Sequence, residues 1–218
     1  AEIFFYRQDI LEKLLSTPLR IWLYFTQKDF IRDGGAAGGN FSLEKGGIQL
    51  VLSRLFEGYS GKTPGVAPFL HEFDHLLDHF DAAEGRLADS QGMLPGMRPD
   101  EGAIYVPKAR ELFMKGKQLE AERYDNLCQH GYRPDAALPI GHPYVFQNDT
   151  EFVAGYFEMF FRNPHYFAAQ NPDLYDSFVL TFGQDTRRFW EADFPFYIQQ
   201  NRDFYRGGQR PPRHGLTI

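Results

Sequence analysis

Cysteine is almost absent from this chain: Cys128 is the only one among 218 residues. A single cysteine cannot form an internal disulfide, and zinc sites built from several cysteines are excluded. Cys128 falls in an apparently helical segment, where a lone cysteine usually behaves as a small buried apolar side chain. We therefore expect Cys128 to have a packing role.

Long apolar runs and an excess of basic residues are also missing. No apolar stretch approaches the ~20 residues that a membrane-spanning helix needs, so the sequence predicts no membrane span. A net charge of −6 and a pI near 5.6 argue against a surface for nucleic acid or for anionic membranes. Repeats and strongly alternating strands are not evident either, and the best strand candidate lies near residues 48–53.

Aromatic residues, by contrast, are abundant, with 22 Phe and 12 Tyr. Together with a hydrophobic share of 43%, they indicate a globular protein with an aromatic-rich core rather than a disordered chain. The length suffices for one domain with extensions. We expect an N-terminal helical extension over 1–47, one main domain over 48–206 and a C-terminal tail over 207–218.

Helices dominate the expected secondary structure. Proline and glycine mark most of their ends, and Pro18 should divide the first helical stretch. The expected helical segments are 8–32, 66–81, 106–129, 149–162, 172–183 and 185–206, with loops at 84–102 and 130–143.

The segment "HEFDHLLDHF", residues 71–80, contains three histidines and three acids. On a helix, His71 and His75 are one turn apart on the same face, opposite a sector of apolar side chains that begins at Val66. Two imidazoles at this spacing can hold one metal ion, and Glu72 follows the first of them. This is the HExxH pattern, in which two histidines bind zinc and the glutamate takes a proton from water.

An ordinary amphipathic helix is the alternative, since the solvent-exposed face of such a helix also carries His and Glu. By chance the motif should occur in roughly one chain in a hundred of this composition. A catalytic zinc needs three protein ligands and one open position, so a third ligand decides between the two interpretations.

Several residues compete for the third position. The extended metzincin pattern requires glycine at position 78 and histidine at position 81, but both are aspartate. Asp81 and His79 stay candidates, although three ligands from one straight helix would strain a tetrahedral site. Glu151 is the better candidate, because it lies on a second expected helix. It could instead serve only its own helix end, since Asn148 precedes it by three residues as in a capping box.

The two segments together resemble the bacterial zinc peptidases of the Mlc titration factor A type. They are more distantly similar to the anthrax lethal factor catalytic domain and the Pro-Pro endopeptidases. The family pattern in the active helix is H-E-F-x-H-x-[LV]-D, and downstream it is Y-G, then E-F-F-A with a second acid seven positions later. The matching residues are His71, Glu72, Phe73, His75, Leu77, Asp78, Tyr144, Glu151, Phe152, Ala154 and Glu158.

The resemblance covers about residues 48–185 and has two departures. Val145 replaces the glycine expected after the tyrosine, and the stretch 82–143 between the motifs is longer than usual. The resemblance implies a predominantly helical α+β, zincin-like catalytic domain with a small sheet. Its active helix would pack against helix 149–162.

The resemblance also implies roles for individual residues in a zinc-dependent peptidase acting on a peptide or protein substrate. His71, His75 and Glu151 would hold zinc, Glu72 would act as general base, and Tyr144 would stabilise the oxyanion.

Two other acids are candidates for the surroundings of the metal. Asp78 is either an acceptor for a ligand imidazole or a solvated side chain. Glu158 either orients a ligand or pairs with Arg162 at i+4.

Two rival functions stay open at this point. One is a metal-binding protein that acts by binding a protein regulator without hydrolysis, and the other is a helical interaction domain with a coincidental motif. The resemblance and the free cysteine favour the cytoplasm, while a chain that starts at Ala1 without Met leaves export open. The sequence does not identify the substrate.

Overall fold

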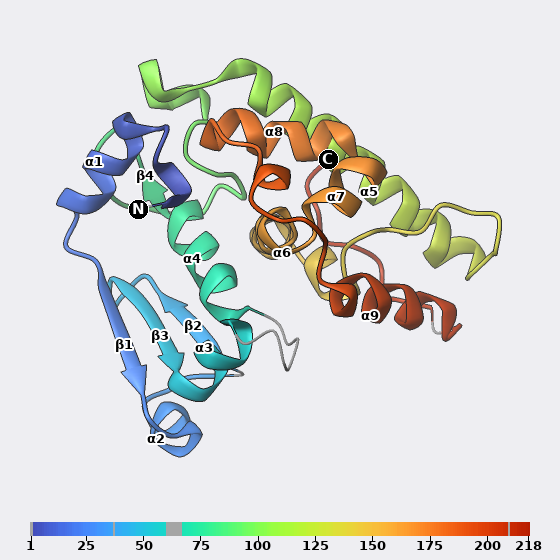
Figure 1. Ribbon diagram of the computed structural model, residues 1–218, viewed down its shortest axis with the longest axis horizontal. Helices are drawn as coiled ribbons and strands as arrows, with labels where there is room; N and C mark the ends of the chain where they lie inside the picture. Colours follow the sequence, from blue (N-terminus) through green and yellow to red (C-terminus); the bar gives the residue numbers. More distant parts are fainter. Residues whose placement is uncertain (1, 37, 60–66, 209) are drawn as a thin grey trace.

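A small sheet and a larger set of helices lie on either side of one central helix, α4 (Figure 1). The computed structural model describes residues 2–36, 38–59, 67–208 and 210–218. Within these ranges the structure is a predominantly helical α+β fold, as expected. Of the helices in the described ranges, none combines the length and the apolar character needed to cross a bilayer.

The N-terminal half contains the strands. Its elements are η1 (Glu2–Phe4), α1 (Gln8–Ser16), β1 (Arg20–Tyr24), α2 (Gln27–Arg32), β2 (Gly39–Ser42), β3 (Gly47–Val51), α3 (Leu52–Tyr59), α4 (Pro68–Asp78), β4 (Phe80–Asp81), β5 (Arg86–Leu87) and η2 (Pro99–Ile104). The C-terminal half is helical. Its elements are α5 (Pro107–His130), η3 (Pro143–Phe146), α6 (Asp149–Arg162), α7 (Pro164–Gln170), α8 (Pro172–Phe182), η4 (Thr186–Arg188) and α9 (Pro195–Arg206).

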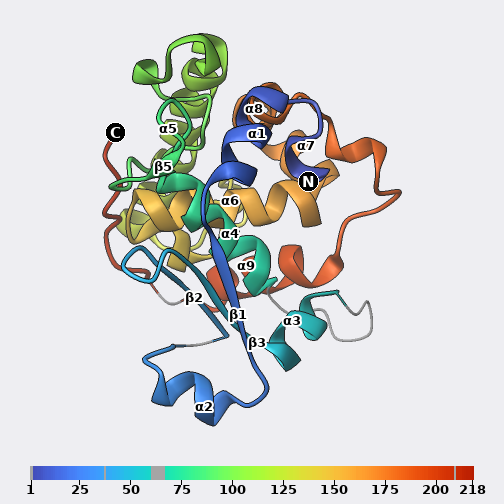
Figure 2. The same cartoon turned by 90° about the vertical axis from the view of Figure 1, so that its left-hand side faces the viewer.

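The three-stranded sheet has the order β1-β3-β2, with β3 parallel to β1 and antiparallel to β2. Every residue of the central strand β3 is buried, including the polar Gln49 among its apolar neighbours. Figure 2 shows β1 in front with α4 behind the sheet. Strand β2 is an edge strand that contacts α4, so it brings backbone groups to the face of that helix.

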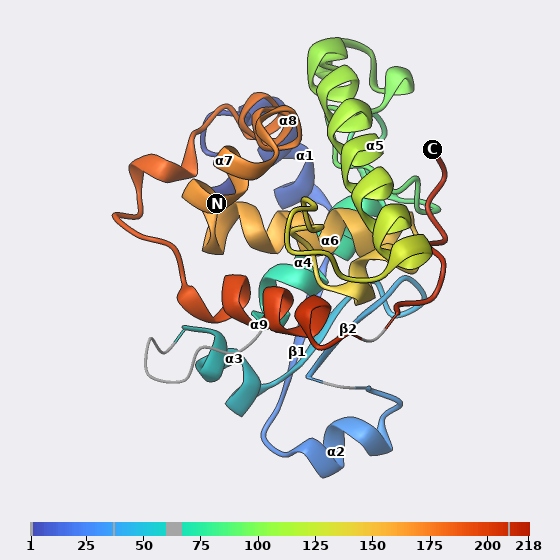
Figure 3. The same ribbon diagram turned by 90° about the vertical axis from the view of Figure 1, so that its right-hand side faces the viewer.

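The core is rich in aromatic side chains, as the composition predicts. Phe160 on α6 packs against Phe178 and Phe182 on α8, with ring centroids 5.5 and 5.6 Å apart. Tyr124 on α5 stacks on Phe146 of η3 with centroids 4.1 Å apart. Aromatic pairs of this kind add stabilisation beyond the area they bury. They pack α6 against α8 and η3 against α5, while α5 and α8 also contact each other directly (Figure 3).

Four of the expected helices are confirmed, at or within three residues of the expected ends: α4, α5, α6 and α8. The strand expected near 48–53 is confirmed as β3. Val66, the expected first apolar residue of the α4 face, lies outside the described residues.

Other expectations are wrong. Residues 8–32 are not continuous helical material around Pro18, since β1 follows it. Residues 1–47 are therefore not a helical extension: they supply two of the three strands, and a domain boundary at 48 would separate β3 from its partners. The stretch 185–206 is helical mainly in α9.

Part of the C-terminal tail is packed against the helices. The backbone N–H of Gly215 donates to the carbonyl of Phe146 at 2.9 Å, and Leu216 is buried. The N–H of Thr217 also donates to the Asp149 carboxylate at 3.0 Å. The last residues of the chain therefore stabilise the region where η3 leads into α6.

Gly155 explains how η3 lies so close to α6. A Cβ atom at this position would lie 2.1 Å from Cγ1 of Val145, which is far inside contact distance. Val145 stands where the resembling family has glycine, and it is buried. The valine side chain therefore occupies the space that Gly155 leaves open.

We predict that Gly155→Ala destabilises the protein by about 1–3 kcal/mol, the usual cost of overpacking a buried contact. Val145→Ala removes the clashing atom, so the double variant should be more stable than the sum of the two single changes predicts. Urea unfolding of the metal-free proteins measures all four free energies. Strictly additive effects would show that the two side chains do not compete for this space.

Candidate metal centre and cleft

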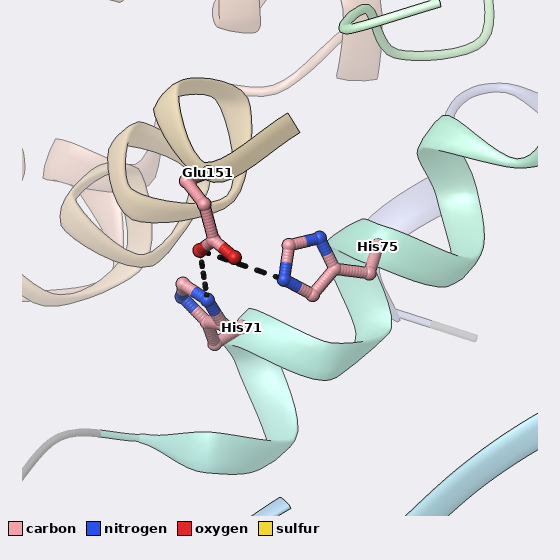
Figure 4. A group of neighbouring side chains, drawn as sticks. All are labelled: His71, His75 and Glu151. Carbon is pink, nitrogen blue, oxygen red and sulfur yellow. Dashed lines mark hydrogen bonds and ion pairs between the residues drawn. The ribbon is translucent and has the colours of Figure 1, made fainter. Parts of the chain in front are cut away.

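Helix α4 places two imidazoles on one face. It starts at Pro68, which suits a first helical position because proline lacks the N–H that would be unpaired there. The four-residue spacing brings the rings of His71 and His75 to a centroid distance of 4.7 Å. Both rings point toward α6 (Figure 4), which confirms the expected geometry of the helix face.

Helix α6 supplies the carboxylate that faces them. The Asn148 side chain accepts a hydrogen bond from the Glu151 N–H at 2.8 Å, so Asn148 caps the helix. The Glu151 side chain extends across to α4, where one oxygen lies 3.0 Å from Nε2 of His71 and 3.7 Å from Nε2 of His75. The cap therefore uses the backbone of Glu151, while its carboxylate is left to face the two histidines.

The three side chains form a set that could hold a metal ion, their ligand atoms lying within 4.8 Å of one another. In a tetrahedral zinc site with bonds near 2.0–2.1 Å, the ligand atoms lie about 3.3 Å apart. The two distances measured from Glu151 fall on either side of this value. Neither Asp81 nor His79 belongs to this set.

The protonation of the three groups is coupled. Burial by itself lowers the pKa of His71, but the Glu151 hydrogen bond and the charge of Glu158 outweigh it and raise that pKa above the ordinary 6.5. Burial opposes the ionisation of Glu151, yet the His71 contact lowers its pKa. Burial and the neighbouring His71 charge lower the pKa of His75 to about 4. Below the raised pKa of His71, His71 and Glu151 therefore form an ion pair beside a neutral His75.

Glu72 lines the same cleft from α4 and is held by the sheet. One carboxylate oxygen accepts a hydrogen bond from the backbone N–H of Phe41 in β2 at 2.7 Å. Burial raises the pKa of Glu72 to about 7, partly offset by the His71 charge and the Phe41 hydrogen bond. A carboxyl group with a pKa near neutrality is suited to accept and release a proton.

Tyr144 reaches the centre from the opposite wall of the cleft. Its hydroxyl donates to the second oxygen of Glu151 at 3.0 Å, and its side chain remains well exposed. Burial of the hydroxyl and the Glu151 charge raise the pKa of Tyr144 to about 12, so the phenol keeps its proton. It is therefore a hydrogen-bond donor at the mouth of the metal centre.

Glu158 lies behind His71, seven residues after Glu151 on the same face of α6. One oxygen accepts from the backbone N–H of Ala67 at 2.5 Å, and the other is 3.8 Å from Nδ1 of His71. Orientation of a ligand by Glu158 stays a prediction, because 3.8 Å is too long for a hydrogen bond. Arg162 stacks on Phe194, 4.0 Å from the ring centroid, and makes no ion pair with Glu158 in the described structure.

Asp78 is neither solvated nor an acceptor for a ligand imidazole in this structure, which corrects both expectations. It is fully buried, and it accepts hydrogen bonds from the backbone N–H groups of Gln91 and Met93 and from the Ser90 hydroxyl. Nδ1 of His75 has no hydrogen-bond partner among the described residues. Asp78 therefore anchors the loop after α4, a role that helical spacing alone does not reveal.

The centre opens into a cleft of about 660 Å³ between the sheet edge and the helices. The lining residues that sequence reasoning did not single out come from β2, from the loop before η3, from α6 and from α9. They include Gly39, Asn40, Phe41, Gly141, Met159, Tyr197, Gln200 and Asn201. These residues lie far apart in sequence and carry no recognisable motif, so only the fold identifies them.

Comparison with known proteins agrees with this geometry. A family model described as glucose-regulated metallo-peptidase M90 matches residues 32–183. That range contains α4, η3 and α6, the elements that carry the centre. No curated protein and no solved structure matches the chain. Because the model spans well over half of the sequence, the chain belongs to the glucose-regulated metallo-peptidase M90 family, whose members are similar to Mlc titration factor A.

Proposed function

We propose that this protein is a zinc-dependent peptidase that hydrolyses peptide bonds with water, using Glu72 as general base. The observation that carries the proposal is the convergence of His71, His75 and Glu151 from two helices at distances suited to one tetrahedral ion. Two imidazoles and one carboxylate are a donor set that zinc favours in catalytic sites, where a fourth position stays open.

Bound zinc would supply Lewis acidity, polarising the scissile carbonyl and making water nucleophilic near neutral pH. The protein's own side chains would transfer the protons and stabilise the developing charge. Glu72 accepts the proton of the attacking water and passes it to the leaving amine. The Phe41 N–H keeps that carboxylate in place. Tyr144 donates a hydrogen bond to the carbonyl oxygen as its negative charge develops, which typically contributes ~3 kcal/mol.

The position of β2 supports a peptide as substrate. It is an edge strand, and residues 38–41 line the cleft. An extended peptide can pair with such an edge through backbone hydrogen bonds, independently of its side chains. No Lys or Arg is among the described lining residues, so electrostatic selection of acidic side chains is not expected next to the metal centre.

The rival function, a metal-binding protein that acts by binding a regulator, requires the same three ligands but not a general base. The buried Glu72, with its pKa near 7, favours catalysis. The two functions therefore differ in what replacement of Glu72 should do.

The first prediction concerns metal content. Wild-type protein supplied with zinc should carry one ion per chain, and Glu151→Ala should weaken binding by more than the roughly 10–100-fold typical of losing an outer partner. Mass spectrometry and chelator competition measure both quantities. Lys108→Ala is the control, because among the described residues this lysine pairs only with Glu111, on the exposed start of α5. One zinc ion per chain in Glu151→Ala would show that another residue is the third ligand.

The second prediction separates catalysis from binding. Glu72→Gln should keep the zinc but lower the hydrolysis rate by about 10²–10⁴-fold, the range that general-base catalysis supplies. The assay is cleavage of a pool of fluorescence-quenched peptides by zinc-loaded protein, with products identified by mass spectrometry. Equal cleavage by wild type and Glu72→Gln would rule out the assigned base. Zinc binding without any cleavage by wild type would favour the regulator-binding function.

The third prediction concerns pH. Zinc must displace the proton that His71 shares with Glu151, and the pKa of His71 lies above 6.5. Zinc affinity should therefore be constant at high pH and fall about tenfold per pH unit below that pKa. The ion pair itself stabilises the metal-free protein at low pH, and this contribution is lost as the pH rises through the folded-state pKa.

Chelator competition between about pH 6 and pH 9 tests this dependence. The thermal shift produced by zinc should increase over the same range, because the metal-free form loses stability while zinc binding gains. Affinity that does not change with pH would contradict the shared proton.

A further inference from the structure

Helix α9 borders the metal centre although it lies beyond the residues that match the family model. The match ends at residue 183, whereas α9 starts at Pro195. Figure 3 shows α9 running beneath α4 and α6. Tyr197, Gln200 and Asn201 of this helix line the cleft. A segment outside the common family region therefore helps to form the surroundings of the centre.

Tyr197 makes the most direct contact from α9. Its hydroxyl donates a hydrogen bond to Oε1 of Glu158, the same oxygen that accepts from the Ala67 N–H at 2.5 Å. Both side chains are buried, with 6% of each exposed. Burial and the Glu158 charge raise the pKa of Tyr197, so its hydroxyl remains a donor. Two donors on one oxygen restrain the orientation of the carboxylate.

The fixed carboxylate directs its other oxygen toward a metal ligand. Oε2 of Glu158 lies 3.8 Å from Nδ1 of His71, and a shift of about 1 Å would form a normal hydrogen bond. An acceptor at Nδ1 keeps the proton there and leaves Nε2 free to bind a metal. Nε2 is the nitrogen of His71 that faces Glu151.

We propose that Tyr197 is a positioning residue of the metal centre, acting through Glu158 to hold the ring and the tautomer of His71. The inference rests on the proposed function in so far as the centre binds zinc. It adds a residue of the C-terminal helix, Tyr197, to the groups on which the affinity of that centre depends.

Zinc affinity of metal-free protein, measured by chelator competition, tests the proposal without an activity assay. Tyr197→Phe should weaken zinc binding by about 10–100-fold, the usual effect of losing an outer partner. Tyr175→Phe is the matched control, because Tyr175 is also a buried phenol, bonded to Asp185 and Thr186 on the side of the fold away from the cleft. Its zinc affinity should equal that of wild type.

A double-mutant cycle with Glu158→Gln separates positioning from general loss of structure. If Tyr197 acts through Glu158, the double variant should bind zinc no more weakly than Glu158→Gln alone. Thermal unfolding of the metal-free proteins verifies that each is folded at the temperature of the binding experiment.

Each other outcome has a distinct meaning. Wild-type affinity in folded Tyr197→Phe, or additive effects in the cycle, would overturn the positioning role and leave the zinc site intact. Absence of zinc binding by wild type would overturn the proposed function and this inference with it.

Discussion

The ion pair between His71 and Glu151 joins the two helices on which the candidate site depends. Their 3.0 Å contact is partly buried, so each charge needs the other, and removal of either partner would leave an uncompensated charge at the interface of α4 and α6. The same contact brings His75 within 3.7 Å of the carboxylate. The three side chains that could bind a metal ion are thus already close together in this fold.

Around this pair, the two other acids that line the cleft are held by different parts of the chain. Glu72 accepts from β2, and Glu158 accepts from the backbone before α4 and from α9. Three carboxylates near two imidazoles create an excess of negative charge when all are ionised, and a divalent cation would offset it. Burial is the main cause of the raised pKa of Glu72, and the charges of Glu151 and Glu158 add to it.

Much of the centre was predictable because its parts follow local rules. The spacing of His71 and His75 requires only a helix, and the start of α6 follows from Asn148 as its cap. The assignment of Tyr144 came from resemblance to a family, and the structure places its hydroxyl at Glu151. Asp78 shows the limit of such reasoning, because helical spacing locates a side chain on a face but not the loop that folds back onto it.

The errors in the fold have a related cause. Strand β1 forms because it pairs in parallel with β3, whose paired residues lie 27 positions later in the chain. A partner at this distance cannot be recognised from the local sequence. By itself, the sequence determined the two ligand-bearing helices, the aromatic core and the residue types available for a metal. Only the tertiary structure decided which acid faces the imidazoles, that β2 supports Glu72, and that Tyr197 of α9 reaches Glu158. Those contacts join segments far apart in the chain, and their geometry depends on how the whole core packs.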